Sequence, residues 1–525
     1  MTLVHEASPD LGGDSEKAGV KVVLACDLGG TSFRAALVDA QGVVHAQSVV
    51  PTVATVGRMG WSEFDATDCW RDLMALCSNL AAAAPRLFGA VQAVAICGMT
   101  RTQVFLGRDG QPLRHAMRWD DARAEDTARQ LTADLPTNHP ELGNVNAFHP
   151  LARLAWLRDE EAATFKNLAT VLEPKDYLNF RLTGRQAGDA ISMARLLACA
   201  AQVDGIDLLR AIGASSTLLP SVLAPCERVG SILPGHPAPL DRLVGVPVFC
   251  CANDTWAAAV GLGALKAGCA YNISGTTEVL GVMSERPAEA PGLLTVDWSG
   301  LSMLGGPSQN GADTARWLSG LLGPIDDDDP AAVGRALDGL LAGRRHAQPL
   351  LFLPYLQGER VPYWDPSLRG AFIGLSRHHG ATDLAFAVLE GVAFQNRVVL
   401  ERAEAAIGQP VTEIRFGGGG ASNPVWRQIK ADVCGRPVVV GESAQPGTMG
   451  AAIVAWTGLG HFASLLQAQV QLVKIAARHE PNAERAMVYQ RLFDLYRRGE
   501  QSLAPISHDL VALSSPMAPS KAPPS

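Results

Sequence analysis

Two short stretches decide the fold, VVLACDLGGTS at residues 22–32 and AYNISGTT at residues 270–277. Each runs from an apolar strand through a tight turn of Gly, Thr and Ser into a second strand. Each also stands near the start of its own half of the chain. A duplicated hairpin that holds phosphate is the economical interpretation, because glycines let the backbone approach a ligand and hydroxyls donate hydrogen bonds to its oxygens.

Short runs rich in Val and Ile alternate with longer helical patterns around the two hairpins. This alternation predicts α/β layers in both halves. The predicted strands are 22–26, 91–97, 247–251, 270–273, 278–282 and 413–416, and the predicted helices include 70–83 and 382–405.

The domain organisation follows from this repeated pattern. We expect a disordered tail over 1–19, an N-terminal domain over 20–263, a C-terminal domain over 264–502 and a flexible Pro/Ser/Ala-rich tail over 503–525. Both tails have too little apolar surface to offset the entropy cost of ordering them. Function is therefore expected in the two domains.

The composition is that of an ordinary globular protein. The 525 residues are 47% hydrophobic, and 44 Lys and Arg against 52 Asp and Glu give a net charge of −8. No block of Lys or Arg supplies the electrostatic footprint of nucleic-acid binding. The stretch 443–473 has no Asp, Glu, Lys or Arg, but Gly, Pro, Gln and Ser interrupt it. We expect neither nucleic acid nor a membrane as a partner.

The cysteines and the N-terminus indicate the compartment. Ten cysteines in this length, with no C-x-x-C pair, are too sparse for a disulfide scaffold. The N-terminal residues are polar and lack the apolar core of a signal peptide. These features favour a cytoplasmic protein.

The first hairpin has the chemistry that a polyphosphate with a hard divalent cation requires. Asp27 at the strand end can hold Mg²⁺ through water, and the hydroxyls of Thr31 and Ser32 can bind phosphate oxygens. The alternative is an ordinary β-hairpin with a glycine turn. The second hairpin favours the phosphate interpretation, because two opposed turns could clamp one phosphate chain between the domains.

A run of four glycines at 417–420 follows the predicted strand 413–416 and leads into a helix that begins near Pro424. Bare backbone there can admit a flat ligand, and a helix N-terminus favours a nearby anion. The alternative is a mobile glycine loop. No G-x-x-x-x-G-K-[ST] motif is present, which excludes a P-loop lysine mechanism.

Asp254 stands after the strand 247–251, in a predicted turn ahead of a helix over 257–265. Phosphoryl transfer to an alcohol needs a carboxylate that accepts the hydroxyl proton. Asp254 is placed for that task, but the same residue could simply cap the helix. The residues alone leave both interpretations open.

Several motifs occur together in a characteristic order, and the chain over roughly 22–502 resembles the FGGY family of carbohydrate kinases, within it the xylulokinases. The matching motifs are the 27–32 hairpin, WDDAR at 119–123, PLARLAW at 150–156, PKDYL at 174–178, RLTG at 181–184, Asn253-Asp254, SGTT at 274–277, PYLQGER at 354–360, EGVAF at 390–394 and GGGGASN at 417–423. Each motif is weak alone, and the collinear set is specific.

The resemblance implies two RNase-H-like domains, of the type found in actin, Hsp70 chaperones and sugar kinases, around a central nucleotide cleft. It implies ATP and Mg²⁺ as cofactors, a small sugar or polyol as substrate, and a homodimer. By the resemblance, Asp254 is the catalytic base and a candidate metal contact, and Asp27 supports Mg²⁺ through water. The residues implied to bind the phosphates are Thr31, Ser32, Gly275 and Thr276, and those implied to bind adenosine are Gly419, Gly420 and Asn423. The sugar is implied to contact Trp119, Asp120 and Asp254.

One motif departs from the resemblance. Xylulokinases usually carry a Gln-Met-His-Gly run where this chain has GMTRTQ at 98–103, so Arg101 stands near the histidine's place in the sugar site. A guanidinium presents up to five donors and a fixed charge. A ketopentose such as xylulose remains the first candidate, and another ketose, a polyol or a sugar acid is the alternative. Arg101 could also pair with Asp120 or Asp121 and only stiffen the wall.

The chain also departs from the family pattern at Arg153, where the family usually has lysine.

Two other classes of protein compete with a sugar kinase as interpretations of the sequence. A protein-directed ATPase of the Hsp70 or actin type would share the hairpins, but no β-sandwich pattern follows residues 417–423. A catalytically silent sugar or nucleotide sensor should have lost Asp254 or a phosphate turn, and the chain retains them.

Overall fold

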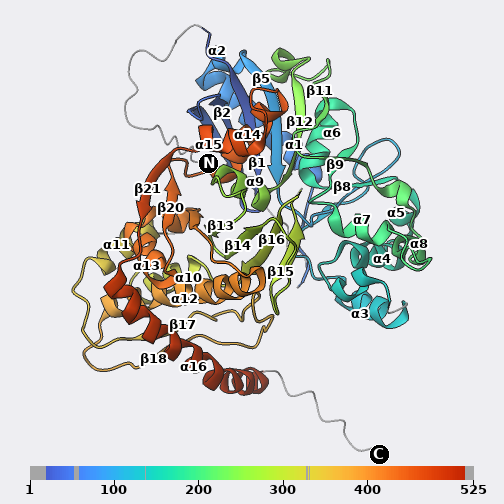
Figure 1. The fold of residues 1–525 in the computed structure, drawn as a ribbon. Helices are drawn as coiled ribbons and strands as arrows, with labels where there is room; N and C mark the ends of the chain where they lie inside the picture. The colour runs from blue at the N-terminus through green and yellow to red at the C-terminus, as the bar shows by residue number, and fades with distance from the viewer. Residues whose placement is uncertain are drawn as a thin grey trace, which may run out of the picture. The chain divides into compact units, whose positions relative to one another are not determined.

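The computed structural model describes residues 19–514 except 53–57, 59, 136–137, 299, 327–328 and 330. It divides into two compact units (Figure 1). Unit 1 holds the described residues up to Asp254 together with Ala451–Ala463, and unit 2 holds Thr255–Gly450 and the described residues from Ser464 on. The tail predicted over 1–19 lies, apart from Gly19, outside the described residues.

A mixed six-stranded sheet forms the centre of unit 1, in the order β11-β12-β5-β1-β2-β3. Its strands are β1 (Val22–Leu28), β2 (Ser32–Asp39), β3 (Val44–Pro51), β5 (Val91–Gly98), β11 (Arg228–Ser231) and β12 (Pro247–Asn253). β1, β2 and β3 are antiparallel, whereas β5 runs parallel to both β1 and β12. Helix α1 (Ala66–Ala83) shares a core with this sheet through Leu73, Leu76 and Leu80, whose spacing places them on one side of the helix.

The other elements of unit 1 fall largely between β5 and β11. They are β4 (Glu63–Phe64), α2 (Pro85–Phe88), β6 (Val104–Leu106), β7 (Ala116–Met117), α3 (Glu125–Asp134), η1 (Pro140–Asn144), α4 (Pro150–Glu160), α5 (Ala162–Asn167), β8 (Thr170–Leu172), α6 (Pro174–Thr183), β9 (Ala187–Asp189), α7 (Ala194–Ala200), α8 (Leu208–Ala211), η2 (Ser216–Leu218), β10 (Ser221–Leu223) and η3 (Leu240–Leu243). Residues of α3, α4, α7 and α8 form a second core.

Unit 2 is built on a seven-stranded sheet in the order β15-β16-β14-β13-β19-β20-β21. Its strands are β13 (Cys269–Ser274), β14 (Glu278–Ser284), β15 (Leu294–Asp297), β16 (Ser302–Ser308), β19 (Glu413–Gly417), β20 (Val438–Gly441) and β21 (Ile475–His479). The order β16-β14-β13-β19-β20 repeats β3-β2-β1-β5-β12 of unit 1 with the same parallel and antiparallel pairings. The prediction of two RNase-H-like α/β domains is confirmed.

The remaining elements of unit 2 are mainly helices. They are α9 (Asp254–Gly261), α10 (Asp313–Leu322), α11 (Ala332–Leu341), β17 (Leu351–Leu353), β18 (Ala371–Ile373), α12 (Ala381–Ile407), η4 (Gly419–Ser422), α13 (Pro424–Cys434), α15 (Leu465–Leu472) and α16 (Ala483–Ser514). Helix α14 (Pro446–Gly458) begins in unit 2 and continues into unit 1. Aromatic and aliphatic side chains of α12, α13 and α16 form the main core of this unit.

The unit boundaries differ from the predicted boundary at 263/264. Most of α9 belongs to unit 2, because small residues let it lie directly against the start of α14: a Cβ atom on Gly261 would lie 1.9 Å from the Pro446 carbonyl oxygen. The chain returns to unit 1 over Ala451–Ala463. There the indole Nε1 of Trp456 donates a hydrogen bond to the Val38 carbonyl oxygen at 3.3 Å.

The flexible tail predicted over 503–525 is wrong for its first part. Helix α16 continues to Ser514, and residues 515–525 lie outside the described part of the chain. Leu503 and Ala504 pack against the core of unit 2, and Ser507 is buried with its hydroxyl bonded to the Leu503 carbonyl at 3.0 Å. These contacts supply the burial that the composition of the tail did not indicate.

Candidate active site

Three neighbouring strands of unit 1 end at the same edge of the sheet. In the parallel register Leu28 of β1 lies opposite Gly98 of β5, and Gly98 lies opposite Asn253 of β12. The first hairpin turn, the segment containing Arg101, and Asp254 follow directly from these strand ends. The fold therefore brings these predicted residues to one edge, where open α/β sheets bind ligands.

The first hairpin forms a closed turn. The Gly29 amide donates a hydrogen bond to the Ser32 carbonyl at 3.0 Å, and the Thr52 amide donates one to the Thr31 carbonyl at 3.1 Å. Thr31 is exposed, whereas Ser32 is buried as the first residue of β2. In the described part of the chain, the buried Ser32 hydroxyl has no hydrogen-bond partner.

Asp27 precedes this turn and has one buried carboxylate oxygen, Oδ1, without a hydrogen-bond partner among the described residues. Burial raises the pKa of this carboxyl, while the charge of Arg34 and a hydrogen bond from the Cys97 thiol oppose that rise. An unpartnered carboxylate oxygen is a suitable acceptor for the water shell of a hard divalent cation. The residues present thus fit a Mg²⁺ ion held through water.

Asp254 is the first residue of α9 and follows β12 without an intervening turn. The predicted turn and the helix over 257–265 are therefore wrong in their boundaries, because the helix spans Asp254–Gly261 and the chain then turns at Gly263, whose φ is +72°. Asp254 is half-buried. Burial raises the pKa of the Cys97 thiol, and the charges of Asp27 and Asp254 act in the same direction.

Trp119 and Asp120 lie beside the first hairpin. A Cβ atom on Gly30 would lie 3.4 Å from Nη2 of Arg118 and 3.5 Å from Nε1 of Trp119. The Trp119 side chain is 39% exposed, and exposed Asp120 forms an ion pair with Arg118 at 3.3 Å. Both residues can therefore meet a ligand near the first hairpin turn, with an indole face for C–H groups and a carboxylate for hydroxyls.

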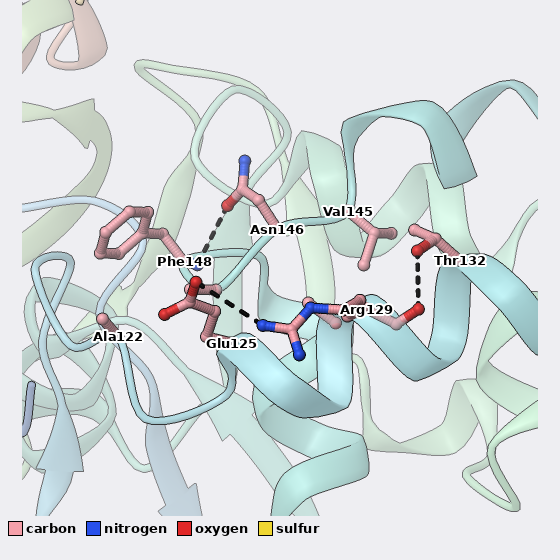
Figure 2. A pocket seen from close by; sticks show the side chains of 9 residues that line it. Ala122, Glu125, Arg129, Thr132, Val145, Asn146 and Phe148 are labelled. Carbon is pink, nitrogen blue, oxygen red and sulfur yellow. Dashed lines mark hydrogen bonds and ion pairs between the residues drawn. The ribbon is translucent and has the colours of Figure 1, made fainter. Parts of the chain in front are cut away.

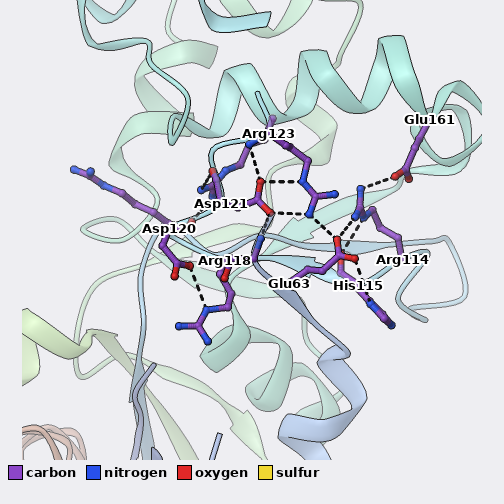
Figure 3. A network of polar contacts seen from close by, with 11 residues as sticks. Glu63, Arg114, His115, Arg118, Asp120, Asp121, Arg123 and Glu161 are labelled. Atoms are coloured by element: carbon purple, nitrogen blue, oxygen red, sulfur yellow. Dashed lines mark hydrogen bonds and ion pairs between the residues drawn. The ribbon is translucent and has the colours of Figure 1, made fainter. Parts of the chain in front are cut away.

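The neighbouring acid, Asp121, has a structural role (Figure 3). It is fully buried, accepts a hydrogen bond from the Ser62 amide at 2.7 Å and pairs with Arg123 at 2.7 Å. The guanidinium of Arg123 also contacts Glu63 at 2.6 Å and lies over the Trp61 ring at 3.6 Å. This network fixes the loop that carries Trp119 and Asp120.

Arg101 does not pair with either aspartate. Asp120 pairs with Arg118 and Asp121 with Arg123, and the guanidinium of Arg101 has no hydrogen bond or ion pair within the described ranges. The prediction that Arg101 stiffens the wall by such a pair is therefore wrong. Its side chain is exposed at the end of β5.

The second hairpin joins β13 and β14. The Gly275 amide donates to the Thr277 carbonyl at 2.9 Å, and the Ala312 amide donates to the Gly275 carbonyl at 2.9 Å. Gly275 and Thr276 are exposed at the tip, whereas Ser274 is buried. The Ser274 hydroxyl has no hydrogen-bond partner in the described structure. A buried serine hydroxyl without a partner also occurs at the first hairpin, where Ser32 follows the turn, whereas Ser274 precedes it.

The buried side chain of Lys430 contacts residues on both strands of the second hairpin. The Lys430 ammonium contacts Asn272 Oδ1 at 2.8 Å and also contacts Glu278 and Asn396. Its charge lies 4.7 Å from the centre of the Phe416 ring. Because Glu278 is the first residue after the turn, this cluster fixes where β14 begins.

The glycine run packs closely on the second hairpin. Gly418 has a φ of +83°, and a Cβ atom there would lie 2.4 Å from the Ser274 carbonyl oxygen. A Cβ atom on Gly420 would lie 2.6 Å from Ser274 Oγ, but one on Gly419 would meet no described atom within 4 Å. The prediction of a mobile glycine loop is therefore wrong for Gly418 and Gly420, and exposed Gly419 leaves open space for a ligand.

Asn423 caps α13, as the start of a helix near Pro424 predicts. Its Oδ1 accepts a hydrogen bond from the Trp426 amide at 2.9 Å, and its Nδ2 donates to Asp338 at 2.9 Å. Both ends of the side chain are thus engaged within unit 2. Contact between Asn423 and a nucleotide stays a prediction.

The positioning of Arg101 depends on residues that the sequence patterns did not single out. Buried Glu173 precedes α6, and its Oε1 accepts a hydrogen bond from the Arg101 amide at 2.8 Å. The motif after it carries fully buried Lys175, which pairs with Asp176 at 2.7 Å and Asp189 at 2.6 Å. Glu173 and Arg101 are 72 residues apart, so the sequence does not pair them, although the adjacent PKDYL motif marks the segment.

A surface hollow of about 450 Å³ lies beside α3 in unit 1 (Figure 2). Its lining residues are Ala122, Glu125, Ala128, Arg129, Thr132, Val145, Asn146, Ala147 and Phe148. None of the predicted site residues lines it. The charged lining residues Glu125 and Arg129 form an ion pair at 3.9 Å, so the hollow offers a ligand no uncompensated charge.

No described helix is long and apolar enough to cross a membrane. No group of three or more His, Cys, Asp or Glu residues in the described ranges is arranged to hold a metal ion. Any divalent cation here would depend on one or two carboxylates and a phosphate chain, as is usual for Mg²⁺.

Comparison with known proteins matches both units. The family model described as the FGGY family of carbohydrate kinases, N-terminal domain, matches residues 22–261, and that of the C-terminal domain matches residues 270–459. The xylulose kinase of Escherichia coli is 30% identical over 92% of this chain and 99% of its own length. That of Bacillus subtilis is 28% identical over 91% and 96%. The crystal structure of the xylulose kinase from Rhodospirillum rubrum superposes with a TM-score of 0.80 at 26% identity, covering 93% of this chain and 100% of that one.

Proposed function

Because the chain belongs to the FGGY family of carbohydrate kinases, it is a phosphotransferase with an alcohol group as acceptor, and we propose that it transfers the γ-phosphate of ATP to a hydroxyl of a small sugar. The observation that carries the proposal is the strand register of unit 1. That register brings Asp254, the Asp27 turn and the Arg101 segment to one carboxyl edge of the sheet. The xylulose kinases among its relatives make a ketopentose such as xylulose the reference acceptor.

In this proposal Asp254 is the catalytic base. Its carboxylate accepts the proton of the acceptor hydroxyl while the oxygen forms a bond to the γ-phosphorus. The bond from that phosphorus to the bridging oxygen breaks, and ADP leaves with the bonding electrons. Such a base contributes about 10²–10⁴-fold to the rate. The helix N-terminus at Asp254 stabilises the negative charge of the carboxylate before it takes the proton.

The two hairpins hold the nucleotide in this proposal. Asp27 would hold Mg²⁺ through water, with Asp254 as a second contact, and the ion would neutralise charge on the phosphates. Thr31, Ser32, Gly275 and Thr276 bind the phosphates, and their support is the unpartnered serine hydroxyl found at each hairpin. Gly419, Gly420 and Asn423 line the adenosine end; open space at Gly419 favours this role.

Trp119, Asp120 and Arg101 bind the sugar in this proposal, because all three are exposed near the edge that carries the base. We place the reaction in the cytoplasm, since all ten cysteines are unpaired, as in a reducing compartment. The homodimer that the family resemblance implies stays a prediction, which light scattering of the purified chain tests.

The experiment is ADP release from ATP and Mg²⁺ by the purified full chain, with D-xylulose, other ketoses, polyols and sugar acids as acceptors. We expect ADP to form with at least one acceptor and only at a low rate without any. Equal ATP hydrolysis with and without every acceptor would contradict the proposal. Sugar or nucleotide binding without any ADP formation would support the silent sensor instead.

A further inference from the structure

Arg101 is an exposed residue three positions after the end of β5. Its guanidinium has no hydrogen bond or ion pair with any described residue. The residue has a φ of +54°, the left-handed region that side chains other than glycine rarely adopt. This backbone conformation is strained in residues other than glycine. Such strain persists only where surrounding contacts enforce it, and it concentrates at functional sites.

Two buried polar side chains, Glu173 and Arg153, hold the backbone of Arg101 in this conformation. Its amide donates to Glu173 Oε1 at 2.8 Å, and its carbonyl accepts from Nη1 of Arg153 at 2.5 Å. Arg153 is fully buried and is anchored on its other side by the Asp121 carbonyl at 3.1 Å. Hydrogen bonds to its amide and its carbonyl therefore fix the backbone of Arg101, whereas its guanidinium bonds to no described residue.

The charges around Arg101 do not neutralise it. Burial and the like charge of Arg195 lower the pKa of Arg101, and the charges of Glu173 and Glu141 oppose that shift. Glu141 is already paired with Arg195 at 3.1 Å and bonded to His149 at 2.8 Å. Burial raises the pKa of the Glu173 carboxyl well above its ordinary value, which weakens it as a counterion. The site thus has an excess of positive charge next to an exposed planar donor.

We infer that the acceptor carries a carboxylate bound by Arg101, so that the preferred substrate is a small sugar acid and not a neutral sugar. The inference rests on the proposed function and narrows its acceptor. The planar fork of a guanidinium matches the two oxygens of a carboxylate, and paired charged hydrogen bonds of this kind are roughly twice as strong as neutral ones. Trp119 and exposed Asp120 remain for the C–H face and the hydroxyls of the same molecule.

The test compares acceptors that share a carbon skeleton: D-xylulose, xylitol, D-xylonate and D-xylulose 5-phosphate, with further five- and six-carbon sugar acids. We expect the best sugar acid to give the highest kcat/KM. Arg101→Gln should lower kcat/KM for that acid by about 10- to 150-fold, mainly through KM, and barely change it for neutral acceptors. Arg101→Lys, which keeps the charge but not the planar fork, should retain an intermediate value.

The matched control is Arg129→Gln, an exposed arginine of the same unit whose ion pairs lie on α3; it should leave every value unchanged. Calorimetry of the sugar acid without ATP gives a second readout, and binding should be lost in Arg101→Gln. If neutral sugars are phosphorylated and sugar acids are not, the inference is overturned but the proposed kinase activity stands. A preference for the sugar phosphate has the same consequence. Arg101-dependent binding of the acid without ADP formation overturns the proposed activity and supports the anion site.

Discussion

Adding one methyl group at Gly420 should disturb the second phosphate turn, whereas adding it at Gly419 should not. A Cβ atom on Gly420 would lie 2.6 Å from Ser274 Oγ and 2.8 Å from both Ser274 Cβ and Trp426, about 0.6 to 0.8 Å inside ordinary van der Waals contact. Overpacking of this kind costs about 1–3 kcal/mol. For a unit of this size that lowers the melting temperature by roughly 2–12 °C.

The functional consequence depends on which atoms yield. The Trp426 ring is fixed by a hydrogen bond to the Leu389 carbonyl at 3.2 Å, so Ser274 and the turn after it should move. A displacement of a large part of an ångström in a positioning group can cost about 10²-fold. We expect Gly420→Ala to lower kcat/KM for ATP by up to about that factor.

Differential scanning fluorimetry and steady-state kinetics with varied ATP separate the two effects. Gly419→Ala should keep the wild-type melting temperature, since its new methyl group meets no described atom within 4 Å. Its KM for ATP should nevertheless rise, because the methyl group occupies the space proposed for the nucleotide. A wild-type melting temperature in Gly420→Ala would refute the steric reasoning, and an unchanged KM in Gly419→Ala would refute the nucleotide contact.

Two further predictions concern buried charges. Lys175→Met should destabilise unit 1 by about 3–5 kcal/mol, because it leaves two buried carboxylates unpaired. The control is Lys166→Met, which changes an exposed lysine on α5. Equal melting temperatures of the two variants would contradict a stabilising role for Lys175. Glu413 is surrounded by Lys266, Arg415 and Arg478, whose hydrogen bonds outweigh burial and lower its pKa from 4.5 to about 2. This stabilisation is therefore present above pH 4.5 and is lost as the pH falls toward 2. Glu413→Gln should lower the free energy of unfolding in urea at pH 7 and flatten this acid dependence. Equal acid sensitivity in both proteins would contradict the reasoning.

Local patterns predicted the strands and turns well. The hairpins at 22–32 and 270–277 and the strand and cap before α13 depend on residues that are neighbours in the sequence. Apolar runs and glycine turns specify such elements directly. The duplication of the sheet in both units could also be predicted, because each half repeats the same order of signals.

Pairings between distant residues could not be predicted. Glu173 contacts Arg101 across 72 residues and Arg153 contacts it across 52, and no local pattern links them. The return of Ala451–Ala463 to unit 1 depends on the packing of a helix against another part of the chain. The extension of α16 past 503 was missed for the same reason, since its contacts, and not its composition, stabilise it.

The most direct test of the account compares turnover and nucleotide affinity in Asp254→Asn. The substitution keeps the shape of the side chain but removes the group that accepts the proton. We predict that acceptor-dependent ADP formation falls by about 10²–10⁴-fold while calorimetry shows unchanged ATP binding. Wild-type turnover in Asp254→Asn would contradict the role of this carboxylate and with it the proposed mechanism.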